Sequence, residues 1–264
     1  MLLAPDEGSP LEVHGRGGPS PFFIICDHAG RLIPRVLGDL GLSEDQLGRH
    51  IAWDIGAAGL AQLLGTALAA HTVLQRYSRL VIDCNRPLQA TDSIVCVSER
   101  TRIPGNQHLD RGDAAARAQA IFHPYHDEIR RALDARKSAG RPTILVALHS
   151  FTPVYLDDAR PWHVGVLYNR DARVARPLLD ALRAEGDLVV GDNQPYAASE
   201  ATDFSIVTHG ERRELPHVEL EVRQDLIADA RGQATWAARL ARLLPIVLDA
   251  LPAPTAPPPL QGTP

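Results

Sequence analysis

Two histidines directly follow short apolar stretches of the sequence. Phe22–Cys26 (FFIIC) leads through one aspartate into His28, and residues 143–148 (TILVAL) lead into His149. Such runs indicate buried strands, and ligand-binding groups collect beyond the carboxyl ends of the strands in open α/β sheets. Two strands that each bring a histidine to the same edge predict a metal site. Either histidine alone could instead hydrogen-bond a loop.

Asp54 is a further candidate ligand. It lies in HIAWDIG at 50–56, just ahead of an Ala- and Leu-rich stretch at 57–70 that predicts a helix. Its carboxylate could join the metal site, or it could cap that helix.

A charged face on an otherwise apolar strand is the third signal. In 217–223 (HVELEVR), alternation places Glu219, Glu221 and Arg223 on one face and three apolar residues on the other. Charged groups on such a strand need partners or a wet cleft. The alternatives for Glu221 are therefore a role in a site or a structural pairing with Glu219 or Arg223.

Two arginines predict an anion-binding group. Arg79 and Arg86 flank the motif LVIDCN, and guanidinium groups bind planar carboxylates at two points. The alternative for both is an internal salt bridge to Asp83 or Asp92.

A pair of histidines on a predicted helix is the last group that could take part. The spacing of His123 and His126 in HPYHDEI allows both to face one side of the helix, which suits the wall of a substrate site as well as a metal. We favour the wall, because the two apolar strands already supply better-placed histidines.

The elements that would position these residues alternate between strand and helix, which is typical of an α/β fold. We expect one domain at 21–251 with a mixed, mostly parallel sheet flanked by helices. Residues 1–20 are expected to form a surface extension, 88–112 a long loop and the Pro-rich 252–264 a disordered tail. The predicted strands are 22–26, 72–74, 80–82, 143–149, 162–167, 188–190 and 218–222, and the predicted helices are 57–70, 114–139 with an interruption at Pro124, 173–185 and 234–251.

The composition of the chain argues against some classes of partner and location. The net charge of -5 and the absence of a basic run with aromatics argue against nucleic acid. Three cysteines without CxxC spacing predict reduced, buried thiols. The acidic, Pro-containing start does not look like a signal peptide and no stretch is apolar enough to span a bilayer, so we expect a soluble cytoplasmic protein.

Six motifs in this order resemble the N-formylglutamate amidohydrolase family: CDHAGRLIP, WDIG, SRLVIDCNRP, HPYHDEI, ALHSFTP and VELEVRQDLI. The resemblance covers residues 20 to 250. It implies a fold similar to the zinc carboxypeptidases and aspartoacylases (phosphorylase/hydrolase-like), one zinc ion per chain, and hydrolysis of an N-acyl amino acid such as N-formylglutamate. From the same resemblance we expect a small anionic substrate. We also expect the protein to be a monomer or a small homo-oligomer.

The resemblance also implies roles for single residues. His28 and His149 match the metal histidines, and Glu221 matches the catalytic carboxylate. Related peptidases carry a glutamate three residues after the first histidine, but Arg31 occupies that position here. Asp54 is therefore our third ligand, with Asp27 as the competitor.

The remaining roles fall to groups that would touch the substrate. Asn85 and Arg86 resemble a pair that grips a substrate carboxylate, and Arg79 resembles an arginine beside the oxyanion. His123, His126 and Arg223 are the further substrate-binding candidates. The alternative is a non-catalytic module that binds a metal or a carboxylate. A serine or cysteine hydrolase is disfavoured because no GxSxG motif is present.

Overall fold

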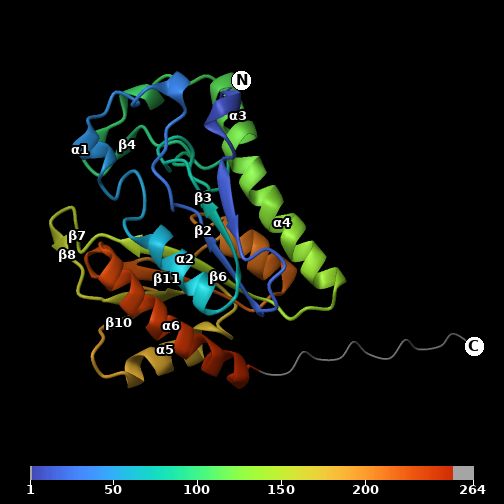
Figure 1. The fold of residues 1–264 in the computed structure, drawn as a ribbon. Coiled ribbons are helices and arrows are strands. Elements are labelled where there is room, and N and C mark those ends of the chain that lie inside the picture. Colours follow the sequence, from blue (N-terminus) through green and yellow to red (C-terminus); the bar gives the residue numbers. More distant parts are fainter. Residues whose placement is uncertain (1, 252–264) are drawn as a thin grey trace, which may run out of the picture.

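The structure is a computed structural model that describes residues 2–251. Its centre is a seven-stranded sheet in the order β1-β3-β2-β6-β11-β9-β10 (Figure 1). Four of the six neighbouring pairs are parallel, and β1–β3 and β11–β9 are antiparallel. The expected mixed, mostly parallel sheet is confirmed. The strands are β1 (Leu11–His14), β2 (Phe22–Cys26), β3 (His71–Gln75), β6 (Ile144–Phe151), β9 (Val164–Leu167), β10 (Val190–Asp192) and β11 (His217–Arg223).

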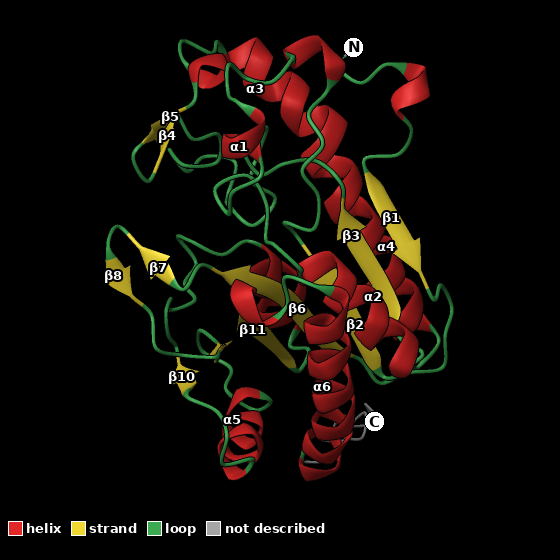
Figure 2. Ribbon diagram, turned by 60° about the vertical axis from the view of Figure 1, so that its left-hand side comes forward, coloured by secondary structure: helices red, strands yellow, loops and turns green. Residues whose placement is uncertain are grey.

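Helices cover both faces of the sheet (Figure 2). One face packs against α2 (Ala57–Ala67), α5 (Ala175–Ala184) and α6 (Ala230–Ala250). The other face packs against α4 (His123–Ser138). Both faces of β6 are therefore buried, which explains its unbroken apolar sequence. The remaining helices are α1 (Glu44–Leu47) and α3 (Arg111–Arg117).

The helix predicted over 114–139 is interrupted before its proline. α3 continues through a π-helical turn at Ala118–Phe122 into α4, and Pro124 occupies the first turn of α4. Proline has no backbone N–H to donate to the preceding turn, so the hydrogen-bond pattern changes just ahead of it.

Two predictions about elements were wrong. Residues 11–14 are not part of a loose extension, because they form β1 and pair with β3 at the sheet edge. Residues 80–82 are buried but form turns instead of a strand. Side chains from elsewhere satisfy their backbone: Asn106 Nδ2 donates to the Leu80 carbonyl at 2.7 Å, and Arg117 Nη1 donates to the Val81 carbonyl at 2.9 Å. An apolar run can therefore be buried without pairing in a sheet.

Three further expectations can be compared with the structure. Cys26 and Cys84 are buried free thiols, but Cys96 is exposed, because it lies in the surface segment 88–112. That segment contains the hairpin of β4 (Val97–Ser98) and β5 (Thr101–Arg102).

Within 2–251, no helix combines the length and the apolar character needed to cross a membrane. The tail predicted at 252–264 lies outside the described residues.

Candidate metal and catalytic site

The candidate residues gather at the carboxyl edge of the central strands. His28 follows β2, His149 lies near the end of β6, and Glu221 lies near the end of β11. Side chains alternate along a strand, and the even-numbered apolar residues of β6 and β11 pack beneath α2, α5 and α6. His149 and Glu221 therefore point to the opposite face, into a cavity of about 440 Å³ that both residues line.

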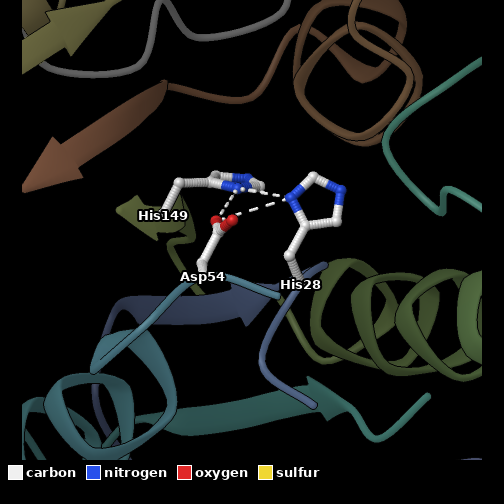
Figure 3. A group of neighbouring side chains, drawn as sticks. All are labelled: His28, Asp54 and His149. Atoms are coloured by element: carbon white, nitrogen blue, oxygen red, sulfur yellow. Dashed lines mark hydrogen bonds and ion pairs between the residues drawn. The ribbon is translucent and has the colours of Figure 1, made fainter. Parts of the chain in front are cut away.

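Three side chains present ligand atoms to one another (Figure 3). The Nδ1 atoms of His28 and His149 are 3.2 Å apart. Asp54 Oδ2 lies 2.9 Å from the His149 Nδ1 and 3.4 Å from the His28 Nδ1. All three residues are buried. Zinc sites use imidazole nitrogens and carboxylate oxygens as ligands, so this donor set fits zinc.

The outer nitrogens of both rings face carboxylates. His28 Nε2 lies 2.7 Å from Asp83 Oδ1, and His149 Nε2 lies 3.2 Å from Asp27 Oδ2. A carboxylate only accepts, so it favours a proton on Nε2 and leaves the lone pair of a neutral ring on Nδ1. Histidines that bind metals are usually oriented in this way. Asp27, the competing third ligand, thus contacts the far nitrogen of His149.

The charge of the cluster also suits a divalent cation. Asp27, Asp54 and Asp83 supply three negative charges, and Arg79 supplies the one guanidinium within residues 2–251 that contacts them, so these four groups carry two net negative charges. Burial alone would lower the pKa of His28 and His149, yet the surrounding carboxylates raise both pKa values. The buried cluster therefore attracts positive charge, which protons or a divalent ion can supply.

Asp54 does not cap α2 with its side chain. The N-cap of α2 is Gly56, with φ +81°, and no side chain caps the helix there. A Cβ at Gly56 would lie 2.1 Å from the Ile227 carbonyl oxygen, which explains the glycine of WDIG. The Asp54 backbone N–H instead donates to the His28 carbonyl at 2.9 Å, and its carboxylate accepts from the Ser150 N–H at 3.2 Å. These bonds aim Asp54 at the two histidines.

Glu221 lies beside this cluster. It is the direct partner of His149 in the parallel pairing of β11 with β6. The side chain is 6% exposed, and its Oε2 has no hydrogen-bond partner among the described residues. Burial raises the pKa of Glu221 to about 7. Glu219, on the same face, is also buried, and burial raises its pKa well above the ordinary range. In the described part of the chain, Glu221 forms neither a hydrogen bond with Glu219 nor an ion pair with Arg223.

Arg79 joins the cluster through Asp83. Its Nε and Nη2 donate to Asp83 Oδ2 at 3.0 and 2.7 Å. Its Nη1 lies 3.7 Å from Asp54 Oδ1 and has no hydrogen bond within the described chain, so one edge of the guanidinium faces the cavity. Arg86 also lines the cavity, but its Nε donates to Asp92 Oδ2 at 2.9 Å. The alternative of internal salt bridges is therefore realised for both arginines.

Asn85 lines the cavity with its amide already occupied. Its Oδ1 accepts from the backbone N–H groups of Phe204 and Ser205 at 3.1 and 3.0 Å, and its Nδ2 lies 3.4 Å from Asp203 Oδ1. These bonds hold the segment that leads into the π-helical turn Ile206–Gly210. In this arrangement Asn85 stabilises the cavity wall. To bind a substrate carboxylate as predicted, its side chain would have to break these hydrogen bonds.

Three predicted substrate contacts do not line the cavity. His123 is exposed on α4. His126 is buried, with Nε2 2.8 Å from the Cys84 carbonyl oxygen and Nδ1 3.0 Å from His209 Nε2. Arg223 pairs with Asp225 at the end of β11. Helical spacing alone could not indicate that α4 turns His126 toward the core beneath Asn85.

Two hairpins supply parts of the cavity wall that the sequence did not indicate. The hairpin of β4 and β5 contributes Val97 and Ser98, and the hairpin of β7 (Val154–Tyr155) and β8 (Asp158–Ala159) contributes Tyr155. Both hairpins lie on the same side of the molecule (Figures 1 and 2). Arg100 and Asp157, in their turns, form an ion pair at 2.6 Å.

The sequence also did not indicate that Asp83 and Asp27 are partners of the histidines, although each is part of a motif.

Comparisons with known proteins show the family of this chain. The family model for N-formylglutamate amidohydrolase matches residues 20–228. The crystal structure of gene product Atu2144 from Agrobacterium tumefaciens shows 37% identity and a TM-score of 0.91, with 95% of this chain and 99% of that chain covered. N-formylglutamate amidohydrolase from Ralstonia eutropha JMP134 shows 18% identity and a TM-score of 0.66, with 91% and 98% covered, a likeness of fold alone. None of the curated proteins compared with the chain matches it. The match over residues 20–228 shows that this chain belongs to the N-formylglutamate amidohydrolase family.

Proposed function

We propose that this protein hydrolyses the amide bond of an N-formyl amino acid such as N-formylglutamate, with one zinc ion per chain and Glu221 as the general base. The observation that carries the proposal is the position of Glu221, a buried carboxyl without a hydrogen-bond partner in the described chain, directly beside the metal-ligand candidate His149. A module that only binds a metal or a carboxylate has no use for such a group.

His28, Asp54 and His149 would hold the zinc ion. When bound, zinc makes a water molecule more acidic and polarises a carbonyl group. Asp83 and Asp27 would keep the imidazoles in the tautomer that offers Nδ1. The Ser150 N–H, which donates to Oδ2, and Arg79, whose Nη1 lies 3.7 Å from Oδ1, would orient the Asp54 carboxylate.

Glu221 would move the proton. Its unpaired Oε2 would accept a proton from the attacking water and later deliver it to the nitrogen of the leaving amino acid. A pKa of about 7 lets the carboxyl act as a base and then as an acid near neutral pH. General acid–base catalysis of this kind contributes roughly 100- to 10,000-fold in rate.

The two cavity arginines would act on oxygen atoms of the substrate. Arg79 Nη1 is available to donate to the developing oxyanion, because Asp83 occupies only the other edge of the guanidinium. Arg86 would release Asp92 and bind the α-carboxylate of the substrate in its place. That exchange is feasible because the Asp92 side chain is 49% exposed and an exposed ion pair is weak.

Release of formate and amino acid from N-formyl-L-glutamate by the zinc-loaded protein tests the proposal. The wild type should turn over the substrate, and Glu221→Gln should lose roughly 100- to 10,000-fold in kcat while it keeps its zinc and its melting temperature. A zinc-loaded wild type that binds N-formyl amino acids without cleaving any of them would favour the binding module instead.

A further inference from the structure

The cavity contains more acidic than basic side chains, which raises the question of how it accepts an anion. Two arginines line it, and both are paired with carboxylates. Its acidic lining residues are Asp54, Asp83, Asp92, Glu99, Asp203, Glu219 and Glu221. N-Formylglutamate carries an α-carboxylate and a second carboxylate on its side chain. The second one requires a cation that the paired arginines do not supply.

Arg160 is a cation of this kind directly behind the cavity wall: it does not line the cavity itself, but its guanidinium packs against two residues that do. Its guanidinium carbon lies 4.6 Å from the ring centre of Tyr155 and 4.7 Å from that of Tyr196, and both tyrosines line the cavity. Arg160 forms no ion pair with any carboxylate in the described part of the chain. Its one side-chain hydrogen bond there runs from Nη1 to the Tyr196 hydroxyl, at 2.7 Å. Nε and Nη2 have no hydrogen-bond partner in that part of the chain.

The two rings hold this guanidinium in place. Aromatic faces attract a cation and fix the plane of the guanidinium group. The Tyr196 hydroxyl accepts a hydrogen bond from Arg160, so its own proton is free to be donated to an anion. The Arg160 backbone N–H also donates to the Pro153 carbonyl at 2.8 Å, which fixes Arg160 at the base of the β7–β8 hairpin.

This cluster lies a short distance along the sheet from the metal-ligand candidates. The Phe151 ring, 6.0 Å from the guanidinium carbon, lines the cavity two residues beyond His149 on the same strand. Two residues of a strand span roughly 7 Å and return to the same face. That spacing suits a glutamyl side chain, whose carboxyl carbon lies four bonds from the amide nitrogen.

We infer that Arg160, stacked on Tyr155 and hydrogen-bonded to the Tyr196 hydroxyl, forms with that hydroxyl a subsite for the side-chain carboxylate of the substrate and makes the enzyme prefer N-acyl derivatives of acidic amino acids. This inference rests on the proposed function for the reaction, but the anion subsite has a separate binding test.

Turnover of two isosteric substrates tests the preference. Arg160→Gln should lower kcat/KM for N-formyl-L-glutamate by about 10- to 100-fold, the effect of losing a hydrogen bond to a charged group. The same variant should change kcat/KM for N-formyl-L-glutamine by less than about threefold, because that substrate lacks the charge. Arg160→Lys should fall between wild type and Arg160→Gln. Equal losses on both substrates would overturn the inference.

Arg176→Gln is the matched control. Arg176 also stacks on a tyrosine, with its guanidinium carbon 5.2 Å from the Tyr168 ring centre, but Tyr168 does not line the cavity, whereas both tyrosines that stack on Arg160 do. Its kcat/KM for both substrates should stay at the wild-type value. A loss in this control that equals the loss in Arg160→Gln would show a general effect of removing a stacked arginine and would also overturn the subsite.

Calorimetry with glutarate and its neutral monoamide, glutaramate, separates the subsite from the reaction. Zinc-loaded wild type should bind glutarate at least about 10-fold more tightly than Arg160→Gln does, while glutaramate binds both equally. If the wild type cleaves no N-formyl substrate, the proposed reaction fails, and this comparison still decides the subsite. Equal glutarate affinity in wild type and Arg160→Gln would overturn it.

Discussion

Glu221 lies directly opposite His149 in the parallel pairing of β11 with β6. Each residue lies two positions before the end of its strand, on the face that lines the cavity. The sheet register itself therefore holds the carboxyl beside the imidazole. A slip of one residue would turn Glu221 to the other face, where Val218, Leu220 and Val222 pack in the core. The candidate base is therefore positioned by the most buried part of the fold.

The two glutamates of β11 should differ in function. Burial raises the pKa of Glu219 well above the ordinary range, which favours the neutral carboxyl, the form that the amide of glutamine resembles. We expect Glu219→Gln to keep kcat within about threefold of wild type, whereas Glu221→Gln loses roughly 100- to 10,000-fold. Parallel kcat measurements on the two zinc-loaded variants check this. Similar losses in both would mean that the proton path includes Glu219.

Asp54→Asn should lower zinc affinity with little loss of stability. The substitution keeps the side-chain volume but replaces a charged ligand with a weaker one, and Asp54 does not cap α2 with its side chain. Zinc content after dialysis and the melting temperature of the zinc-free protein separate the two effects. Unchanged zinc with a lower melting temperature would show that Asp54 is structural.

Asp83→Asn should weaken zinc binding although Asp83 is not itself one of the three candidate ligands. Its carboxylate accepts from His28 Nε2 and from Arg79, and loss of such a partner lowers metal affinity by about 10- to 100-fold. Asp92→Asn is the control, because Asp92 pairs with Arg86 at the surface. Competition with a chromophoric chelator measures both affinities. Equal affinities in the two variants would argue against this role for Asp83.

Acid should destabilise the fold through a buried histidine pair. Burial lowers the pKa of His126 to about 4 and that of His209 to about 3. Because unfolded histidine titrates near 6.5, the unfolded chain binds more protons between these values, and stability falls as the pH drops from about 6.5 toward 4. His126 alone should cost about 2 kcal/mol of unfolding free energy between pH 7 and pH 5.

Urea denaturation of wild type and His126→Gln at both pH values isolates this contribution. The variant is expected to be less stable at pH 7, because the bond to the Cys84 carbonyl is perturbed, but to lose less stability on acidification. If the two proteins lose the same amount between pH 7 and pH 5, His126 does not titrate in this way.

The sequence predicted the parts of the site that depend on a single strand. Alternation in 217–223 placed Glu219 and Glu221 together, and the apolar runs ahead of His28 and His149 predicted their shared edge, because side-chain direction follows from strand periodicity. The parallel pairing of β2 with β6 then brings the two histidines to one end of the sheet.

What the sequence could not predict depends on contacts between distant segments. Asp83 was considered only as a partner of arginine, since nothing local indicates that it lies 2.7 Å from His28 Nε2. Arg160 lies in an exposed hairpin with no motif, and Tyr196 reaches it from a separate loop. The buried turns at 80–82 have the composition of a strand, and only Asn106 and Arg117 reveal how their backbone is satisfied.

The wide separation of the candidate ligands along the chain has a consequence for biosynthesis. His28 and His149 are 121 residues apart, while Asp54 is bonded through its backbone to the His28 carbonyl. Ribosomes add about 5 to 20 residues per second, so the first two ligands leave the ribosome roughly ten seconds before the third. Until β6 docks between β2 and β11, the nascent chain holds only one histidine and one carboxylate of the candidate ligand set, too few for a closed zinc site. The proposed zinc ion thus enters a sheet that is already assembled.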